Sequence, residues 1–218
     1  MIIFDCNGVL VDSEPIATAV AAEAFRNIGI DIKPETVARY FAGRRPADMF
    51  AEIESASGVR LPAKFPLTVS AAILQRLQQD LRPIPHVVHA LTWLRGPKCV
   101  ASSSSPERVR LSLEVTELER FFGKNVFSAN DVKNGKPEPD LFRLVSERTG
   151  VAVKDCYVVE DSPAGVTAAV AAGMTAIGFV GGSHAETNLA AKLAGAGAAA
   201  VIADMRALKS TVVDLRGF

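Results

Sequence analysis

The sequence predicts an α/β protein with a doubly wound parallel sheet and an inserted all-helical cap domain. Three observations lead to this prediction. An apolar strand opens the chain, no strand-like run occurs from residue 15 to residue 81, and strands alternate with helices from residue 98 onward. Such alternation is typical of parallel sheets with right-handed crossovers. We therefore expect residues 1–14 and 82–218 to form the core and residues 15–81 to form the cap.

The first strand places a candidate catalytic residue. The apolar run from Met1 to Phe4 predicts a buried strand, and Asp5 follows at its carboxyl end. Ligands of open α/β sheets bind just outside the carboxyl ends of the strands. A carboxylate in that position is costly to desolvate unless it meets a cation or takes part in chemistry. Asp5 is therefore our candidate nucleophile.

Helical periodicity fills the predicted cap. Ser13 is the expected N-cap of a first helix, which Pro15 begins and Gly29 ends. Two hinge passages, near residues 12–15 and 80–84, are expected to connect the cap to the core. The other cap helices are expected at residues 34–41, 46–57 and 67–81.

The pattern changes after Pro83, where the core resumes. A helix is expected over residues 84–94, a turn at Gly96-Pro97, and a further helix start at Pro106 with Ser105 as its N-cap. The remaining strands are expected at residues 98–102, 125–129, 156–160, 174–179 and 199–202, and the remaining helices at 139–149, 163–172 and 184–194.

The composition argues against several classes of protein. With 24 basic and 24 acidic residues among 218, the net charge is zero, so no overall field attracts nucleic acid or an anionic membrane. No apolar run approaches the roughly 20 residues of a membrane span, and we expect no cleavable leader. The cysteines, Cys6, Cys99 and Cys156, are widely spaced, which indicates reduced packing residues of a cytoplasmic protein.

Polar residues follow several predicted strands of the core. Ser102 ends the second strand, Lys136 precedes a helix, and Glu160 and Asp161 follow a later apolar run. Each has an ordinary explanation as a cap, a turn or a solvated charge. Together with Asp5, however, they combine carboxylates, a hydroxyl and an ammonium group at one sheet edge. This combination favours phosphoryl transfer assisted by Mg²⁺, which prefers oxygen ligands.

Four segments in this order resemble the motifs of the haloacid dehalogenase superfamily, in its branch of β-phosphoglucomutase-like proteins and sugar phosphatases with a helical cap. The family motif DxDGxxxDS is matched by Asp5-Cys6-Asn7-Gly8-Val9-Leu10-Val11-Asp12-Ser13. The other three are matched by Val100-Ala101-Ser102, Lys136-Pro137-Glu138-Pro139-Asp140 and Glu160-Asp161-Ser162-Pro163-Ala164-Gly165. The resemblance covers essentially the whole chain and implies a Rossmann-like core with a helical cap.

The resemblance also implies roles for the matched residues. Asp5 would be the nucleophile that forms an aspartyl-phosphate, and Ser102 and Lys136 would hold the phosphoryl group. A carboxylate nucleophile divides one difficult hydrolysis into two easier displacements. The Mg²⁺ ligands would be Asp5, the main-chain carbonyl of Asn7 and Asp161, with Glu160 in support.

Asn7 departs from the family motif. The family has an aspartate there, which acts as general acid for the leaving alcohol and then as general base for water. An amide cannot exchange that proton at neutral pH, and general acid–base catalysis typically contributes about 10²–10⁴ in rate. We therefore expect impaired turnover: either Asn7 is a substitution that traps bound substrate, or the protein has lost catalysis. Asp12, also in the motif, is expected to have a structural turn role.

The cap is expected to determine the substrate. Arg44 and Arg45 lie in a loop between cap helices, where they either bind a distal anion of the substrate or remain solvated. Gly8 and Ser103 are the other expected substrate contacts. Ala17 stands where related phosphomutases have a hinge histidine, which argues against mutase chemistry. The expected substrate is therefore a small phosphorylated sugar or sugar acid resembling 6-phosphogluconate, bound by a monomer or weak homodimer.

Three alternatives remain beside a phosphatase. The chain could be a catalytically silent sugar-phosphate-binding protein, or a phosphomutase of the β-phosphoglucomutase type. Dehalogenation of 2-haloacids would use Asp5 without a metal ion, and the pair Glu160-Asp161 argues against it. The histidines are expected to be surface residues, at positions His86, His89 and His184.

Overall fold

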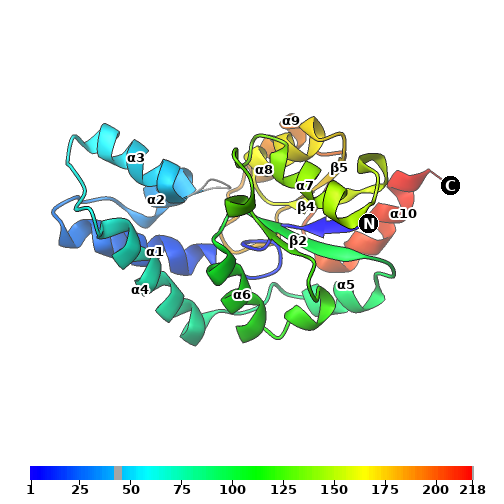
Figure 1. The fold of residues 1–218 in the computed structure, drawn as a ribbon, viewed down its shortest axis with the longest axis horizontal. Coiled ribbons are helices and arrows are strands. Elements are labelled where there is room, and N and C mark those ends of the chain that lie inside the picture. Colours follow the sequence, from blue (N-terminus) through cyan, green and yellow to red (C-terminus); the bar gives the residue numbers. More distant parts are fainter. Residues whose placement is uncertain (42–45, 218) are drawn as a thin grey trace.

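The computed structural model describes residues 1–41 and 46–217 and confirms the predicted parallel sheet. Six parallel strands lie in the order β3-β2-β1-β4-β5-β6 (Figure 1). Their bounds are β1 (Ile2–Phe4), β2 (Lys98–Ser102), β3 (Val126–Ser128), β4 (Tyr157–Glu160), β5 (Thr175–Phe179) and β6 (Ala200–Ile202). The first strand of the chain therefore lies in the middle of the sheet.

Helices cover both faces of the sheet, as the predicted doubly wound fold requires. Ile2 and Phe4 of β1 belong to one apolar cluster, and Ile3 points to the other face and belongs to a second cluster. The first cluster includes buried residues of α5 (Val87–Trp93), α6 (Pro106–Val115) and α10 (Leu208–Arg216). The second includes those of α7 (Asp140–Thr149), α8 (Pro163–Ala171) and α9 (Leu189–Gly195). Short 3-10 helices lie in the connections, at η1 (Glu119–Phe121), η2 (Ala129–Asp131), η3 (Val153–Asp155) and η4 (Met205–Ala207).

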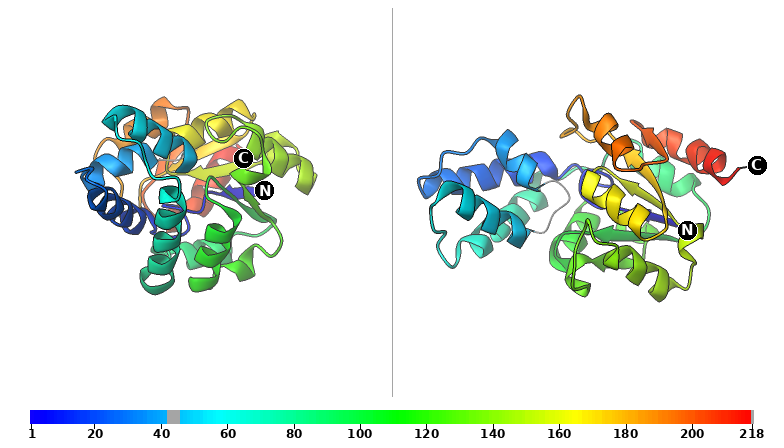
Figure 2. Two further views of the ribbon diagram at one scale, coloured as in Figure 1. Left: turned by 60° about the vertical axis from the view of Figure 1, so that its left-hand side comes forward. Right: turned by 90° about the horizontal axis from the view of Figure 1, so that it is seen from above.

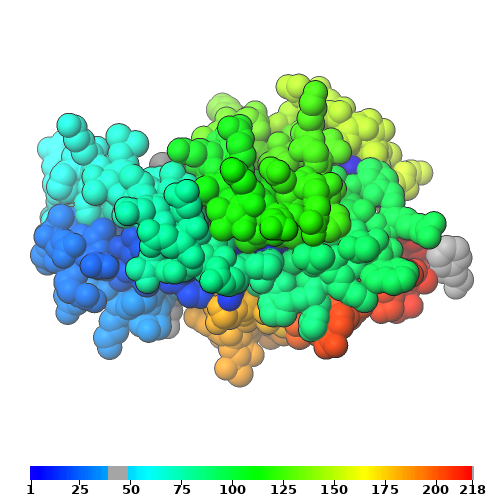
Figure 3. Space-filling model, turned by 90° about the horizontal axis from the view of Figure 1, so that it is seen from below, coloured from blue at the N-terminus to red at the C-terminus, as the bar shows by residue number. Residues whose placement is uncertain are grey.

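The first four helices after β1 form a separate group at one end of the molecule (Figure 2). They are α1 (Glu14–Asn27), α2 (Pro34–Phe41), α3 (Pro46–Ser57) and α4 (Phe65–Asp80). Phe25, Phe50 and Phe65 pack together within this group, with ring centroids 5.0 to 6.1 Å apart. At the boundary with the core, α4 packs against α6, and the two helices form one continuous surface in Figure 3.

The remaining features of the chain agree with the predictions in part. The three cysteines are free and buried, as expected. The helix expected at residues 184–194 begins only at Leu189, because the residues before it form a loop that reaches across the sheet edge. Helix α10 lies outside the expected elements, because its two buried residues, Leu208 and Val212, give only a weak periodic signal. Among the helices of the described residues, none is long and apolar enough to cross a membrane.

Candidate active site

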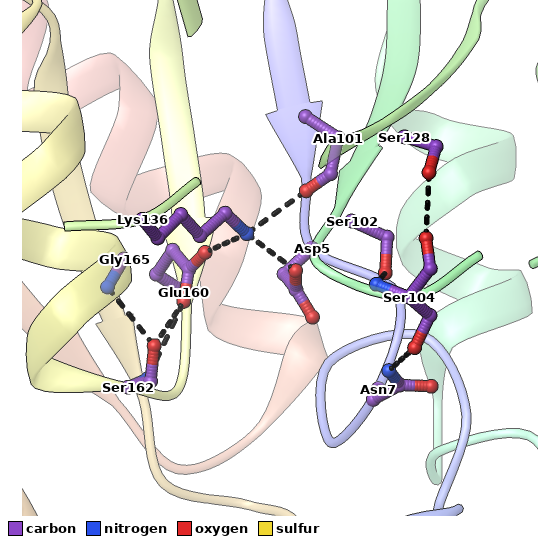
Figure 4. Close-up of polar contacts among 10 residues, drawn as sticks. All are labelled: Asp5, Asn7, Ala101, Ser102, Ser104, Ser128, Lys136, Glu160, Ser162 and Gly165. Carbon is purple, nitrogen blue, oxygen red and sulfur yellow. Dashed lines mark hydrogen bonds and ion pairs between the residues drawn. The ribbon is translucent and has the colours of Figure 1, made fainter. Parts of the chain in front are cut away.

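The carboxyl ends of three neighbouring strands bring together residues that are far apart in the sequence. Asp5 follows β1 directly, and its backbone N–H donates a hydrogen bond to the carbonyl of Val159 at 3.0 Å. Ser102 ends β2 and Glu160 ends β4, and these strands pair with β1 on either side. The side chains of Asp5, Ser102 and Glu160 consequently lie at one edge of the sheet (Figure 4).

Lys136 joins this edge from the loop before α7. Its Nζ lies 2.5 Å from Oδ1 of Asp5 and 2.5 Å from Oε1 of Glu160, and it donates to the carbonyl of Ala101 at 2.9 Å. Burial alone would lower the pKa of Lys136, but the two carboxylates outweigh it and raise the pKa above its ordinary value. The ammonium group is therefore charged at neutral pH and fixed between two acids.

The buried acids outnumber this ammonium group. Burial raises the pKa of Asp5, the positive charge of Lys136 lowers it, and the negative charge of Asp161 raises it further. Burial likewise raises the pKa of Glu160, against the opposing effect of Lys136. Three carboxyl groups thus lie close enough to influence one another. A cation bound beside them would oppose this effect and favour their ionised forms.

Glu160 is held on its other side by the start of α8. Ser162 Oγ donates to Glu160 Oε2 at 3.0 Å and accepts from the backbone N–H of Gly165 at 3.0 Å. A Cβ atom at Gly165 would lie 2.0 Å from the Glu160 carboxyl carbon. Only glycine therefore allows the helix to pass so close to this carboxylate.

Asn7 is fixed by two hydroxyl groups. Its Nδ2 donates to Ser104 Oγ at 2.7 Å, and Ser13 Oγ donates to its Oδ1 at 2.9 Å. Ser13 is the N-cap residue of α1, as predicted, but its side chain makes no cap hydrogen bond and donates to Asn7 instead. The amide thus occupies the position between β1 and the segment after β2 that the family motif gives to a proton-transferring aspartate.

The serine segment after β2 forms a rigid turn beside Asp5. Ser104 N–H donates to Ser102 Oγ at 3.2 Å, and Ser128 Oγ donates to the carbonyl of Ser104 at 2.7 Å (Figure 4). Ser105 caps α6 as predicted, accepting from the backbone N–H of Arg108 at 3.3 Å. These hydrogen bonds fix Ser102 and Ser104 at the carboxyl end of β2, beside Asp5 and Asn7.

Asp161 has an ion-pair partner that the sequence analysis placed elsewhere. His184 Nε2 lies 2.9 Å from Asp161 Oδ2, so the expectation that His184 is only a surface residue is wrong. Burial lowers the pKa of His184, but the hydrogen bond and charge of Asp161 raise it to about 9. The preceding residue, Ser183, donates from both N–H and Oγ to Asp12 Oδ1, at 3.2 and 2.8 Å. These contacts hold the loop before α9 against the β1 motif. His86, the N-cap residue of α5, and His89, within α5, are exposed, as expected.

Two of the predicted substrate contacts lie at this edge and two cannot be placed. Gly8 adopts φ +73°, and a Cβ atom there would lie 1.9 Å from Asp161 Oδ2, so the turn after Asn7 passes directly against this carboxylate. Ser103 is buried between Ser102 and Ser104. Arg44 and Arg45 lie outside the described residues.

The oxygen donors at this edge fit a divalent cation. Asp5 gives Oδ1 to Lys136 and Asp161 gives Oδ2 to His184, so each keeps one carboxylate oxygen outside these ion pairs. No group of three His, Cys, Asp or Glu side chains within residues 1–41 and 46–217 forms a metal site. The third donor that the family motif implies is instead the main-chain carbonyl of Asn7. Carboxylate and carbonyl oxygens are the ligands that Mg²⁺ prefers.

Two further charged residues beside Asn7 escaped the sequence analysis. Arg108 is buried, and its Nη2 donates to Ser13 Oγ at 3.4 Å and lies 3.7 Å from Glu14 Oε1. Neither residue belongs to the motif positions that carry chemistry in the family. The sequence offers only an arginine in the first turn of a predicted helix, where the helix dipole disfavours a cation, and this does not show that the side chain is buried.

Comparisons with known proteins agree with this geometry. A family model described as haloacid dehalogenase-like hydrolase matches residues 1–173. The chain is 29% identical to 6-phosphogluconate phosphatase of Escherichia coli over 184 residues, 84% of this chain and 83% of that protein. It is 32% identical to a phosphorylated carbohydrates phosphatase of Thermotoga maritima over 183 residues, 81% of this chain and 82% of that protein. A haloacid dehalogenase-like protein of unknown function from Agrobacterium tumefaciens has a similar solved structure. Its TM-score is 0.86 with 36% identity, over 99% of this chain and 98% of that one.

Proposed function

The chain belongs to the haloacid dehalogenase-like hydrolase family, and we propose that it is a Mg²⁺-dependent phosphatase for a small phosphorylated sugar or sugar acid. The main support is Lys136, buried 2.5 Å from both Asp5 and Glu160. This contact holds a carboxylate in place while leaving its second oxygen outside the ion pair. Relatives named as phosphatases of 6-phosphogluconate and of phosphorylated carbohydrates support the substrate class.

In the first proposed step, a carboxylate oxygen of Asp5 attacks phosphorus and the bond from phosphorus to the sugar oxygen breaks. The products are an aspartyl-phosphate and a sugar alkoxide that needs a proton. Lys136 and the hydroxyl of Ser102 neutralise and orient the phosphoryl oxygens, because both lie beside Asp5 at the strand ends. Fixed donors of this kind need little rearrangement as charge develops.

In the second proposed step, water attacks the aspartyl-phosphate and releases inorganic phosphate, restoring Asp5. In this proposal, an acid at position 7 would give the first proton to the sugar oxygen and accept one from this water. Asn7 can do neither, since both its amide atoms are engaged with hydroxyl groups and an amide does not titrate. We propose that turnover is lowered by about 10²–10⁴ for this reason.

The Mg²⁺ ion is proposed to be held by Asp5, Asp161 and the main-chain carbonyl of Asn7. Glu160 supports it indirectly by fixing Lys136. When bound, the ion supplies positive charge to the phosphoryl oxygens. The protein's own contribution is to hold the two carboxylates at a fixed spacing, through Lys136 for Asp5 and His184 for Asp161.

Restoring an acid at position 7 tests the proposal. The Asn7→Asp protein is expected to release inorganic phosphate from at least one member of a sugar-phosphate panel about 10²–10⁴ times faster than the unaltered chain. Adding Asp5→Asn to that variant should abolish the release, and so should chelation of Mg²⁺. If Asn7→Asp releases no phosphate from any panel member, with or without Mg²⁺, the phosphatase proposal fails.

A silent binding protein on the same scaffold is the second candidate. The hydrogen bonds at both amide atoms of Asn7 favour it, because this side chain has partners in the structure although it cannot transfer a proton. Calorimetric titration with the same panel separates the two ideas. If the unaltered chain and the Asn7→Asp variant both bind a sugar phosphate tightly and the variant does not hydrolyse it, the protein is a binding protein. Rapid turnover by the variant would exclude this second candidate.

A further inference from the structure

One buried cation near the site has no part in the phosphoryl transfer proposed above. Arg108 has 8% of its surface exposed and lies in the first turn of α6, where the helix dipole disfavours a positive charge. Its side chain makes one hydrogen bond to the described residues, the 3.4 Å contact with Ser13, and its buried Nε has no partner among them. Neither the dipole nor the hydrogen bonding explains why an arginine is buried here. Buried N–H groups without a partner are rare in proteins and call for a specific reason.

A short chain of contacts connects Arg108 to the position of proton transfer. Arg108 reaches Ser13, Ser13 donates to Asn7 at 2.9 Å, and Asn7 donates to Ser104 at 2.7 Å. In the proposed reaction, residue 7 exchanges a proton with the oxygen that leaves with the sugar. On that basis Ser13, which contacts the amide oxygen of Asn7, and Arg108, which contacts Ser13, lie on the side of the sugar.

Glu14 supplies an acceptor beside the same guanidinium group. Its Oε1 lies 3.7 Å from Arg108 Nη2, and it is the first residue of α1, directly after the connection from the sheet. Burial raises the pKa of Glu14, Arg108 lowers it, and the charges of Asp161 and Asp5 raise it again. Glu14 is thus within electrostatic range of the catalytic carboxylates.

We propose that Arg108 and Glu14 form a subsite for the hydroxyl groups of the sugar next to the scissile phosphoester. The inference rests on the proposed phosphatase function and assigns the part of the substrate that this pair contacts. A hydroxyl group accepts from a guanidinium N–H and donates to a carboxylate, so it satisfies both partners at once. A second anionic group fits less well, because Glu14 already supplies the countercharge of Arg108 and would repel it.

The test compares two esters in the Asn7→Asp background. One is the sugar phosphate that this variant hydrolyses fastest, and the other is p-nitrophenyl phosphate, which has no sugar hydroxyl. Arg108→Met is expected to raise KM for the sugar phosphate about 10- to 100-fold, because hydrogen bonds to a charged group are lost. For p-nitrophenyl phosphate, kcat/KM should stay within about twofold. Arg110→Met, an exposed change on the same helix, is the matched control and should alter neither ester.

Other outcomes overturn the inference. If Arg108→Met lowers kcat/KM equally for both esters, Arg108 contributes to phosphoryl binding or to folding and not to a sugar subsite. Unchanged kinetics with both, even with a lower melting temperature, would leave it a structural link between α1 and α6. If Arg108→Met does not fold, Glu14→Gln carries the same comparison, with a smaller rise in KM for the sugar phosphate alone. Failure of the phosphatase proposal is distinct, because the Asn7→Asp parent would then hydrolyse no sugar phosphate.

Discussion

Replacing Lys136 by methionine should destabilise the protein far more than a typical surface substitution. The ammonium group lies 2.5 Å from Asp5 and 2.5 Å from Glu160, and all three side chains are buried. Removing it leaves two buried carboxyl groups without a countercharge. Loss of one partner from a buried ion pair typically costs about 3–5 kcal/mol of the free energy of unfolding. Hydrolytic activity should be lost in the same variant.

The loss of unfolding free energy in Lys136→Met should increase as the pH rises. Without Lys136, burial still raises the pKa of Asp5 and of Glu160, and no positive charge from this position opposes it. The native variant then binds more protons than its unfolded chain above about pH 4, where unfolded Asp and Glu ionise. Its free energy of unfolding therefore decreases as the pH rises. The deficit relative to the parent should be larger at about pH 7 than at about pH 5.

Urea unfolding at these two pH values measures the deficit, and Lys124→Met is the matched control, because Lys124 is exposed. The control should lie within about 0.5 kcal/mol of the parent at both pH values. A deficit for Lys136→Met below about 1 kcal/mol would refute the reasoning, since a buried pair would then contribute no more than a surface one. A deficit that is the same at both pH values would show that loss of Lys136 does not change the protonation of these carboxyl groups between about pH 5 and about pH 7.

The remaining predictions concern the glycine beside Glu160 and the metal ligands. Gly165→Ala should lower the free energy of unfolding by about 1–3 kcal/mol in urea, because its Cβ would lie 2.0 Å from the Glu160 carboxyl carbon. Gly195→Ala, where a Cβ meets nothing within 4 Å, should be neutral or stabilising by up to about 1 kcal/mol, and equal losses for both would contradict the steric argument. Excess Mg²⁺ should raise the melting temperature of the unaltered chain, and Asp161→Asn should remove this shift. A shift that persists in Asp161→Asn would place the ion elsewhere.

The sequence alone predicts the sheet and the residues at its carboxyl edge. Asp5, Ser102 and Glu160 each follow an apolar run, and parallel strands necessarily end on the same side. Lys136 has no such anchor, because it lies in a loop, so hydrophobic periodicity does not determine which strand ends it reaches. The structure adds that it contacts Asp5 and Glu160 equally closely.

Contacts that depend on the path of a loop could not be predicted from periodicity. His184 was expected in a helix, and only the late start of α9 lets it reach Asp161. Arg108 resembles any charged residue in the first turn of a helix until its burial and its contact with Ser13 are known. Ser13 itself satisfies the sequence rule for an N-cap, but Asn7 competes successfully for its hydroxyl group.

The central position of β1 has a consequence for biosynthesis. Its neighbours β2 and β4 begin at Lys98 and Tyr157, so one edge of β1 stays unpaired until nearly half of the 218 residues are made and the other edge until about residue 157. At 5–20 residues per second, β4 leaves the ribosome about 8–30 s after β1. The helices α1 to α4, with their own aromatic centre, are complete well before then. The unpaired edge of β1 therefore stays exposed in the nascent chain for many seconds, and ribosome-associated chaperones can bind it during that time.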